Sequence, residues 1–297
     1  MTVAFVTSNS YNPTGFPGTR KDNEMTAEVG LWLATPDFDP TPVQLATEDF
    51  VDAAIKAEQL FPIPNIDNYE SRDKADTIYE SPGGNEKLLL HGKRRKTYQL
   101  DIPLLVHQAL QSFNNSNLRQ YRIHDDGKIS FYHNGTKAHG FTTSMIQTGM
   151  MTDVPADGST PAFTPFMVNM SNYREWDAFG GHITPTWDAV GKEGLRSVVL
   201  EIVGTPTSSL VVVRVYSPDG LNADGTVKEV AVKGIVQADF VVGFGTAVSM
   251  TDNADGTYTF TSSAAFSTGT VNLKAPSAME STGLLIKSTG AATVTIA

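Results

Sequence analysis

The sequence predicts a mainly β protein: a β-sandwich or barrel domain with one or two short helices, followed by a second β-sandwich. Three observations predict it. Asp-Gly and Asn-Gly pairs lie between runs of alternating apolar residues, a pattern typical of tight β-hairpins. From about residue 195, short β-branched runs alternate with Gly, Asp and Asn turns, as in an all-β sandwich. The 297 residues are 40% hydrophobic and 18% charged, which is a globular composition with room for two domains.

The domain boundary is expected near residue 192. The composition changes there, and "GKEG" supplies linker-like residues, so we expect domains at 1–192 and 193–297. Within the first, residues 1–45 contain many Asn, Pro and Gly and are expected to form an extended arm or loop. The stretch "AEVGLWLAT", in the later part of residues 1–45, predicts a first strand.

Two amphipathic stretches predict the helices. Residues 47–61 form an apolar stripe, Thr47 suits the N-cap, and the prolines of "PIPNI" stop the helix. Residues 103–113 repeat apolar side chains on one face, and Pro103 fits a first helical turn.

Between these helices the chain is polar and then basic. Residues 67–86 end in a Pro-Gly-Gly break and predict a long loop, and loops of this length are usually functional. Strand material returns in "KLLLHGKRRKTYQLDI", with the basic run "KRRK" at residues 93–96. In a strand these four cations would be divided between two faces.

The stretch "YRIHDDGKISFY", residues 121–132, predicts a hairpin closed by an Asp-Gly turn. The adjacent Asp125 and Asp126 do not set up an acid and a base across a substrate. We therefore interpret this turn as reversing the chain rather than carrying a reaction. "NADGT", found at residues 222–226 and again at 253–257, is likewise interpreted as a hairpin turn rather than a ligand site.

Few residues suggest a chemical site. The chain has no cysteine, which excludes disulfides, thiolate metal sites and a cysteine nucleophile. His124, His133 and His139 lack a tight metal-ligand spacing, and we expect exposed hairpin histidines. "DNADGTYTF" lacks the ligands of a calcium loop, and "GFGTAV" lacks the third glycine of a dinucleotide fingerprint. "REWDAFGGH" places Glu175 and Asp177 beside an aromatic side chain, as sugar sites do, although such an aromatic more often anchors a loop.

The distribution of charge along the sequence indicates which kinds of partner the protein can bind. The net charge is −10, concentrated in residues 1–90, which argues against binding DNA through its phosphates. The basic run directly follows this acidic region, so a charge match between subunits is one interpretation and contact with nucleic acid is the other. The apolar stretch at the start of the sequence is too short and too uncharged for a signal peptide, and no run reaches the length of a membrane helix. We therefore expect a soluble protein without membrane insertion.

The middle of the chain resembles a known family. In order and spacing, "EKLLLHGKRRKTYQLDIPLLVHQALQSF", "YRIHDDGKISFY", "GTKAHGFTTSMIQTG" and "MVNMSNYREWDAFGGHITP" resemble the tail tube (major tail) proteins of long-tailed bacteriophages. The C-terminal part, with "DNADGTYTFTSS" and "GTVNLKA", looks like the immunoglobulin-like decoration domains of phage virion proteins. The turn-rich stretch 1–45 is longer than a minimal tube subunit needs.

The resemblance implies a structural virion protein rather than an enzyme, with no cofactor. It implies hexameric rings that stack into a tube, contacts with other tail proteins, DNA passing through the lumen, assembly in the host cytoplasm, and a C-terminal domain that can face the host surface. We expect assembly contacts at Tyr79, Glu80, Lys93, Arg94, Arg95 and Lys96. The alternatives are a capsid-decoration or baseplate protein, a carbohydrate-binding adhesin-like protein using Trp176 and Trp187, and an enzyme using Glu175 and Asp177.

Overall fold

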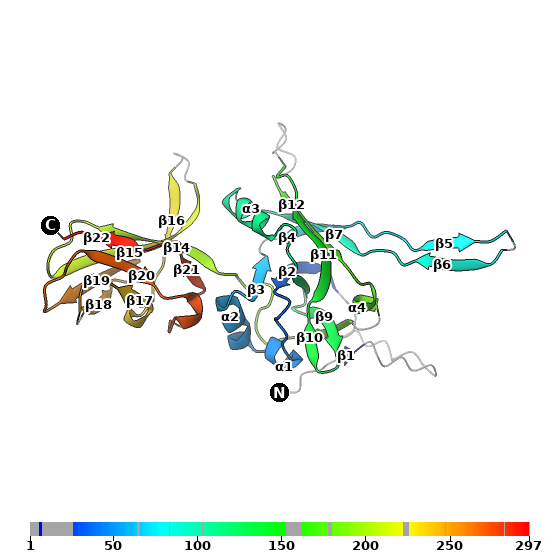
Figure 1. The fold of residues 1–297 in the computed structure, drawn as a ribbon, viewed down its shortest axis with the longest axis horizontal. Helices are drawn as coiled ribbons and strands as arrows, with labels where there is room; N and C mark the ends of the chain where they lie inside the picture. The colour runs from blue at the N-terminus through cyan, green and yellow to red at the C-terminus, as the bar shows by residue number, and fades with distance from the viewer. Residues whose placement is uncertain are drawn as a thin grey trace. The chain divides into compact units, whose positions relative to one another are not determined.

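The computed structural model confirms a mainly β protein (Figure 1). It describes residues 6–7, 26–63, 66–82, 84–102, 104–152, 162–177, 180–221, 226–246, 248–281 and 283–296. The chain divides into two compact units. The first runs to Gly194 without residues 55–57, and the second comprises Ile55–Ala57 and Leu195–Ala297.

The first unit is built on one large sheet that curls into a half-barrel. Its strands follow the order β1-β13-β9-β8-β11-β12-β7-β4, while β10 pairs with β9 and β2 lies between β3 and β8. A separate two-stranded ribbon is formed by β5 and β6. The strands are β1 (Val6–Thr7), β2 (Glu28–Ala34), β3 (Leu60–Ile63), β4 (Ile66–Ser71), β5 (Thr77–Glu80), β6 (Glu86–Leu90), β7 (Arg95–Leu100), β8 (Arg119–His124), β9 (Ile129–Asn134), β10 (Lys137–His139), β11 (Phe141–Thr148), β12 (Thr164–Met170) and β13 (Gly180–Ile183).

Strand β2 is buried on both faces, which explains its nearly continuous apolar sequence. Leu31 and Leu33 join one hydrophobic cluster with Tyr98, Leu100, Ile146, Phe166 and Val168 from β7, β11 and β12. On the opposite face, Trp32 stacks on Trp187 with ring centroids 5.9 Å apart. The Trp187 indole also donates a 2.9 Å hydrogen bond to the carbonyl of Ala46. Trp187 is therefore an anchor inside this unit.

The predicted hairpin at residues 121–132 is confirmed. β8 and β9 pair antiparallel with Ile123 opposite Ile129. The turn is closed by a 2.9 Å hydrogen bond from the amide of Gly127 to the carbonyl of His124. Gly127 has a positive φ of 78°, a conformation that glycine adopts without steric cost.

Both predicted helices form, but with different bounds. The helices are α1 (Pro42–Leu45), α2 (Glu48–Lys56), α3 (Leu104–Leu110, followed by a 3₁₀ turn at Gln111–Phe113) and α4 (Arg174–Asp177). The helix expected over 47–61 ends at Lys56, because the chain turns at Glu58 with φ 57° and residues 60–63 pair with β2. Thr47 does not cap through its side chain, which donates to the carbonyl of Val43. Pro103 lies outside the described residues.

The second unit is a β-sandwich. A six-stranded sheet has the order β18-β19-β15-β14-β21 with β16 beside β15, and it packs on a three-stranded sheet, β17-β20-β22. The strands are β14 (Arg196–Val203), β15 (Leu210–Leu221), β16 (Val227–Ala231), β17 (Phe240–Val242), β18 (Val248–Asp252), β19 (Thr257–Ser262), β20 (Gly269–Leu273), β21 (Ile286–Ser288) and β22 (Ala292–Val294). Short 3₁₀ turns lie at Gln237–Asp239 and Pro276–Ala278.

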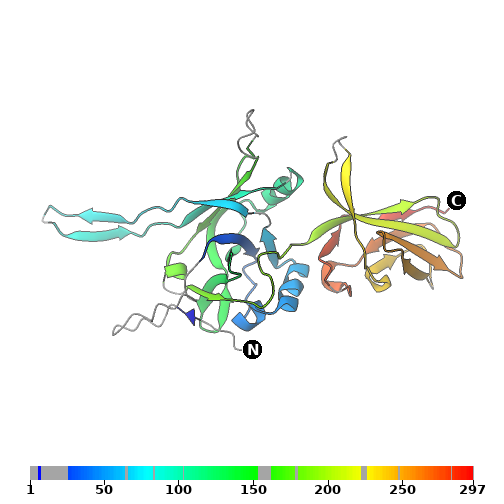
Figure 2. The ribbon, with the colours of Figure 1, turned by 180° about the vertical axis from the view of Figure 1, so that it is seen from behind.

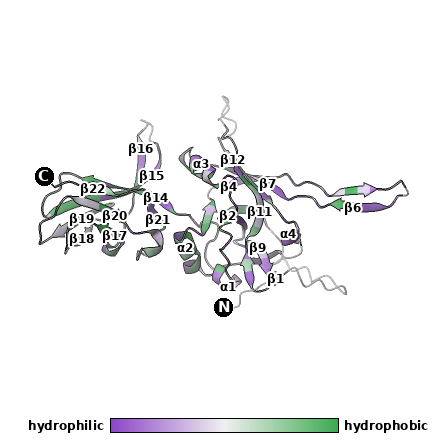
Figure 3. Ribbon diagram, viewed as in Figure 1, coloured by the Kyte–Doolittle hydropathy of each residue, from purple (hydrophilic) through white to green (hydrophobic). Residues whose placement is uncertain are grey.

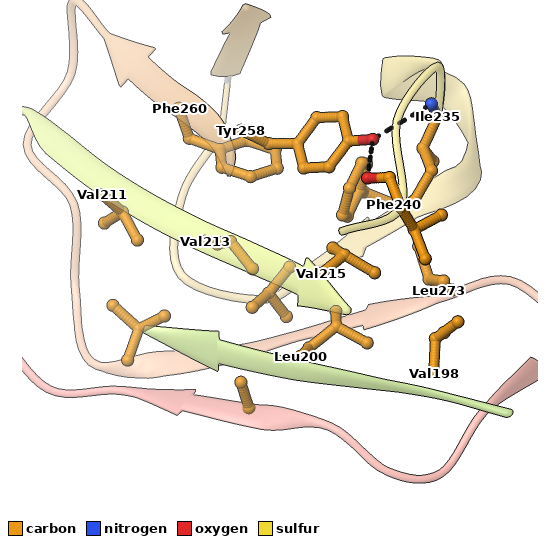
Figure 4. Packing of buried hydrophobic residues seen from close by; sticks show 14 of the residues in the cluster. Val198, Leu200, Val211, Val213, Val215, Ile235, Phe240, Tyr258, Phe260 and Leu273 are labelled. Atoms are coloured by element: carbon orange, nitrogen blue, oxygen red, sulfur yellow. Dashed lines mark hydrogen bonds between the residues drawn. The ribbon is translucent and has the colours of Figure 1, made fainter. Parts of the chain in front are cut away.

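Alternate residues of β15 and β19 fill the sandwich core (Figure 4). Tyr258 is fully buried, and its hydroxyl donates to the carbonyl of Val232 at 2.9 Å and accepts from the amide of Ile235 at 3.3 Å. The second "NADGT" is the turn between β18 and β19, with Ala254 and Gly256 at positive φ. Most of the first copy, residues 222–225, lies outside the described residues.

Candidate assembly interface

The most distinctive feature of the first unit is a long two-stranded ribbon, which we call the arm and define as residues 66–100 (Figures 1 and 2). At its base β4 pairs with β7, with Ser71 opposite Lys96. Backbone hydrogen bonds from Arg72 to Arg95 (2.8 Å) and from Lys74 to Lys93 (2.9 Å) continue the ladder outward. Strands β5 and β6 then form the distal part. Residues 67–86 were expected as a loop, and the structure corrects this to one strand of a ribbon together with the turn at its tip and the first residue of β6.

Side chains and a glycine hold the middle of the arm together. Asp73 accepts a 2.7 Å hydrogen bond from the amide of Arg95, and Asp76 accepts one of 2.6 Å from the amide of Gly92. A Cβ atom at Gly92 would lie 1.9 Å from the carbonyl oxygen of Lys74, so only glycine fits between the two sides of the ribbon there. These contacts replace regular strand geometry with local bonds, and they keep the ribbon closed.

The distal part of the arm is exposed along its whole length. Every residue of β5 and β6 is exposed. Five large hydrophobic side chains lie there with exposed fractions of 42–64%: Ile78, Tyr79, Leu88, Leu89 and Leu90. Figure 3 shows hydrophobic segments on these two strands with hydrophilic residues beyond them toward the tip. A two-stranded ribbon is at best marginally stable by itself in water. This apolar surface is therefore suited to being covered.

At the base, strand β7 is locked into the half-barrel by a buried charge cluster. The carboxylate of Glu28 accepts hydrogen bonds from the Lys96 ammonium and the Tyr98 hydroxyl. The Nε of Arg122 lies 3.8 Å from the same carboxylate. Burial by itself would raise the pKa of Glu28, but the two cations outweigh it and hold that pKa below its usual value. The carboxylate is therefore charged, and it fixes β7 at the base of the arm to β2 and β8.

The expected assembly residues are placed at two different positions along the arm. The basic run lies near the base, with Lys93 exposed, Arg94 4.0 Å from Asp73, and Lys96 in the Glu28 cluster. Arg94 also lies 5.8 Å from the ring centroid of Trp176. Arg94 and Lys96 thus meet acidic groups of their own chain, while Lys93 is exposed to solvent.

Tyr79 and Glu80 lie in β5 instead, in the distal part of the arm. Sequence reasoning missed the leucines of β6 and the role of Glu28. The signals were three consecutive leucines followed by a basic run, and a carboxylate at the start of an apolar strand.

The other candidate residues are engaged inside the fold. His124 is buried, contrary to the expected exposed histidine, with its ring nitrogens 3.0 Å from the Thr26 carbonyl and 2.8 Å from the Ser130 hydroxyl. Glu175 accepts hydrogen bonds from the amide and hydroxyl of Thr142, at 2.6 and 2.8 Å. The side chain of Asp177 lies outside the described residues. Among the residues described, no group of three or more His, Asp or Glu could hold a metal ion.

Trp176 is likewise enclosed rather than open as a platform. The guanidinium of Arg122 lies 4.6 Å from its ring centroid, and the ring of Phe141 lies 5.2 Å away. In "GFGTAV", β17 ends before the motif and strand β18 begins at its last residue, while Ala247 lies outside the described residues.

No protein-family model matches this sequence, and no curated protein matches it. Within the described part of the chain, no helix combines the length and apolar content needed to cross a membrane.

Proposed function

We propose that this protein is a structural subunit that self-assembles through its arm, and that its assembly is the stacked-ring tube of a bacteriophage tail. The observation that carries the proposal is the exposed apolar surface of β5 and β6 at the end of a ribbon that is firmly anchored at its base. An enzyme or a sugar-binding site finds less support, because Glu175, Trp176 and Trp187 all have partners inside the fold.

The free energy available from covering the arm is of the same order as the cost of association. Fully burying a large apolar side chain contributes about 1.5–3 kcal/mol. Five side chains that are each about half exposed therefore offer roughly 4–8 kcal/mol per arm. Association itself costs about 4–15 kcal/mol, so one arm by itself gives at most a weak contact. A ring or stack repeats the contact for every subunit, which suits an assembly that forms at high local concentration.

The finer features of the proposal follow the family resemblance. Six subunits form each ring, rings stack through the arm, and DNA passes through the lumen without specific binding. The C-terminal sandwich is proposed to be immunoglobulin-like and to contact the host surface. A capsid-decoration or baseplate subunit is the second candidate, since an exposed apolar arm suits any repeated virion contact.

The test is assembly of the full-length chain at high concentration, measured by sedimentation velocity and negative-stain electron microscopy. We expect rings or filaments from the wild type. The variant Leu89→Asp with Leu90→Asp should remain a monomer of 32.0 kDa. Val43→Asp is the matched control, because Val43 is 62% exposed on α1, away from the arm. A wild type that stays monomeric, or arm variants that assemble as well as the wild type, would contradict the proposal.

A further inference from the structure

One face of the arm carries an ordered series of charges, which follows from the strand register. In a ribbon, alternate residues of each strand share a face, and directly paired residues point the same way. The hydrogen bonds place Arg72 beside Arg95 and Lys74 beside Lys93. Farther out, Ile78 is opposite Leu88 and Glu80 is opposite Glu86. All these pairs lie on one face, which we call the charge strip.

The charge strip changes sign along its length. Near the base it presents two pairs of cations, then Asp76 opposite His91, then an apolar pair, and at the tip a pair of carboxylates. A bulge between Thr77 and Ile78 shifts the register by one residue on the β6 side but leaves the β5 alternation unchanged. The backbone bonds from Arg72 to Arg95 and from Lys74 to Lys93 keep the two segments paired between the base and β5, and we infer that the tip continues the same face as the base.

Two of these pairs are unfavourable within a single subunit. Like charges directly opposite each other destabilise a ribbon. The repulsion between Arg72 and Arg95 is reduced because the Arg72 guanidinium forms an ion pair with the Glu70 carboxylate, with 2.8 Å between nitrogen and oxygen. In the described part of the chain, Lys74, Lys93, Glu80 and Glu86 form no ion pair, and all four are exposed. A cationic pair and an anionic pair of equal size thus both stay outside the ion pairs of their own subunit in the described part of the chain.

We propose that the partner of the charge strip is the strip of a second copy of this chain, with the Lys74–Lys93 pair of one copy against the Glu80–Glu86 pair of the other. The inference rests on the proposed self-assembly and assigns its chemistry. The two pairs are six residues apart on β4–β5, about 20 Å at strand spacing. That separation exceeds the Debye length of about 8 Å at physiological salt, so they cannot neutralise each other within one arm.

The same arrangement argues against nucleic acid as the partner. A phosphate backbone would be attracted to the cations at the base but repelled by the carboxylates that follow on the same face. A second copy satisfies both ends, and it brings Ile78 and Leu88 against another apolar surface between them. Charge complementarity of this kind fixes the register of a contact more than its affinity.

Charge-swap variants test the inference. The tip variant Glu80→Lys with Glu86→Lys and the base variant Lys74→Glu with Lys93→Glu should each fail to assemble alone, sedimenting near the 32.0-kDa monomer. An equimolar mixture of the two should assemble, because each tip then meets a base of opposite charge. The fourfold variant should also assemble. Lys87→Glu is the control, since Lys87 pairs with Tyr79 on the opposite face of the tip.

The outcomes separate this inference from the proposed function. If the wild type assembles and both charge-swap variants assemble equally well, the inference is wrong while self-assembly stands. If each variant fails to assemble alone and the mixture also fails to assemble, the pairing of base with tip is wrong. If the wild type is monomeric, self-assembly itself fails. Binding of a labelled DNA duplex at low salt that is lost only in the base variant, with assembly unchanged, would instead identify nucleic acid as the partner.

Discussion

Replacing Glu28 by Gln should strongly destabilise the first unit. Glu28 and Arg122 are almost completely buried, and Lys96 is mostly so. The substitution keeps the shape of the side chain but leaves two cations in the half-barrel with no carboxylate. Breaking a buried ion pair by removing one partner costs about 3–5 kcal/mol. With a urea m-value of about 2–3 kcal/mol per molar, the unfolding midpoint should fall by about 1–2.5 M.

Tryptophan fluorescence is the appropriate assay. All three tryptophans, Trp32, Trp176 and Trp187, lie in the first unit, so their emission follows the unfolding of that unit alone. The double variant Glu28→Gln with Lys96→Met should recover part of the loss, because one unpaired cation is removed with its partner. A free energy of unfolding for Glu28→Gln within about 0.5 kcal/mol of wild type, against the loss of about 3–5 kcal/mol expected, would refute a stabilising role for this cluster.

The same carboxylate gives a pH dependence with a definite sign. The pKa of Glu28 in the folded protein lies below its usual value of 4.5. The stability that the charged form contributes is therefore fully present above pH 4.5 and is lost as the pH falls through the lower folded value. Wild-type stability should fall over this acid range, and Glu28→Gln should show a smaller fall in the same titration.

Two further predictions concern the arm and the second unit. Gly92→Ala should open the middle of the arm, because its Cβ would overlap the carbonyl oxygen of Lys74. Limited proteolysis should then cut residues 72–94 faster than in wild type. Gly290→Ala is the control: its added Cβ would have no atom within 4 Å, so cleavage should stay unchanged. Phe244→Ala should lower the free energy of unfolding of the second unit by about 3–5 kcal/mol, because Phe244 is fully buried in edge-to-face contact with Phe260 and Phe266. Calorimetry should show one transition at a lower temperature, while the transition detected by tryptophan fluorescence keeps its temperature. A shift of both transitions would contradict separate units.

Local sequence was sufficient where turn chemistry decides the structure. The Asp-Gly turn at residues 125–128 and the second "NADGT" were predicted because positive φ at glycine is a local requirement. The mainly β class was predicted for the same reason, since many such turns separate short β-branched runs.

Sequence reasoning failed where partners distant in the chain decide the structure. Leu60 and Phe61 continue the apolar stripe of α2, but pairing with β2 draws them into a strand. Residues 67–86 are polar enough to predict a loop, yet their backbone pairs with a segment that comes later in the chain. Glu28 has no local signal of its partners, because Lys96 and Arg122 are 68 and 94 positions away.

The hydrogen-bonded pairing of the arm's two strands also has a mechanical consequence. Hydrogen bonds between antiparallel strands run perpendicular to the strands. When the two strands are pulled in opposite directions along their length, a load along the ribbon is shared by all these bonds at once. A load that separates the strands at one end opens the bonds one after another. The arm should therefore resist sliding of one strand past the other better than peeling from its tip, with the bulge beside Ile78 as its most compliant point.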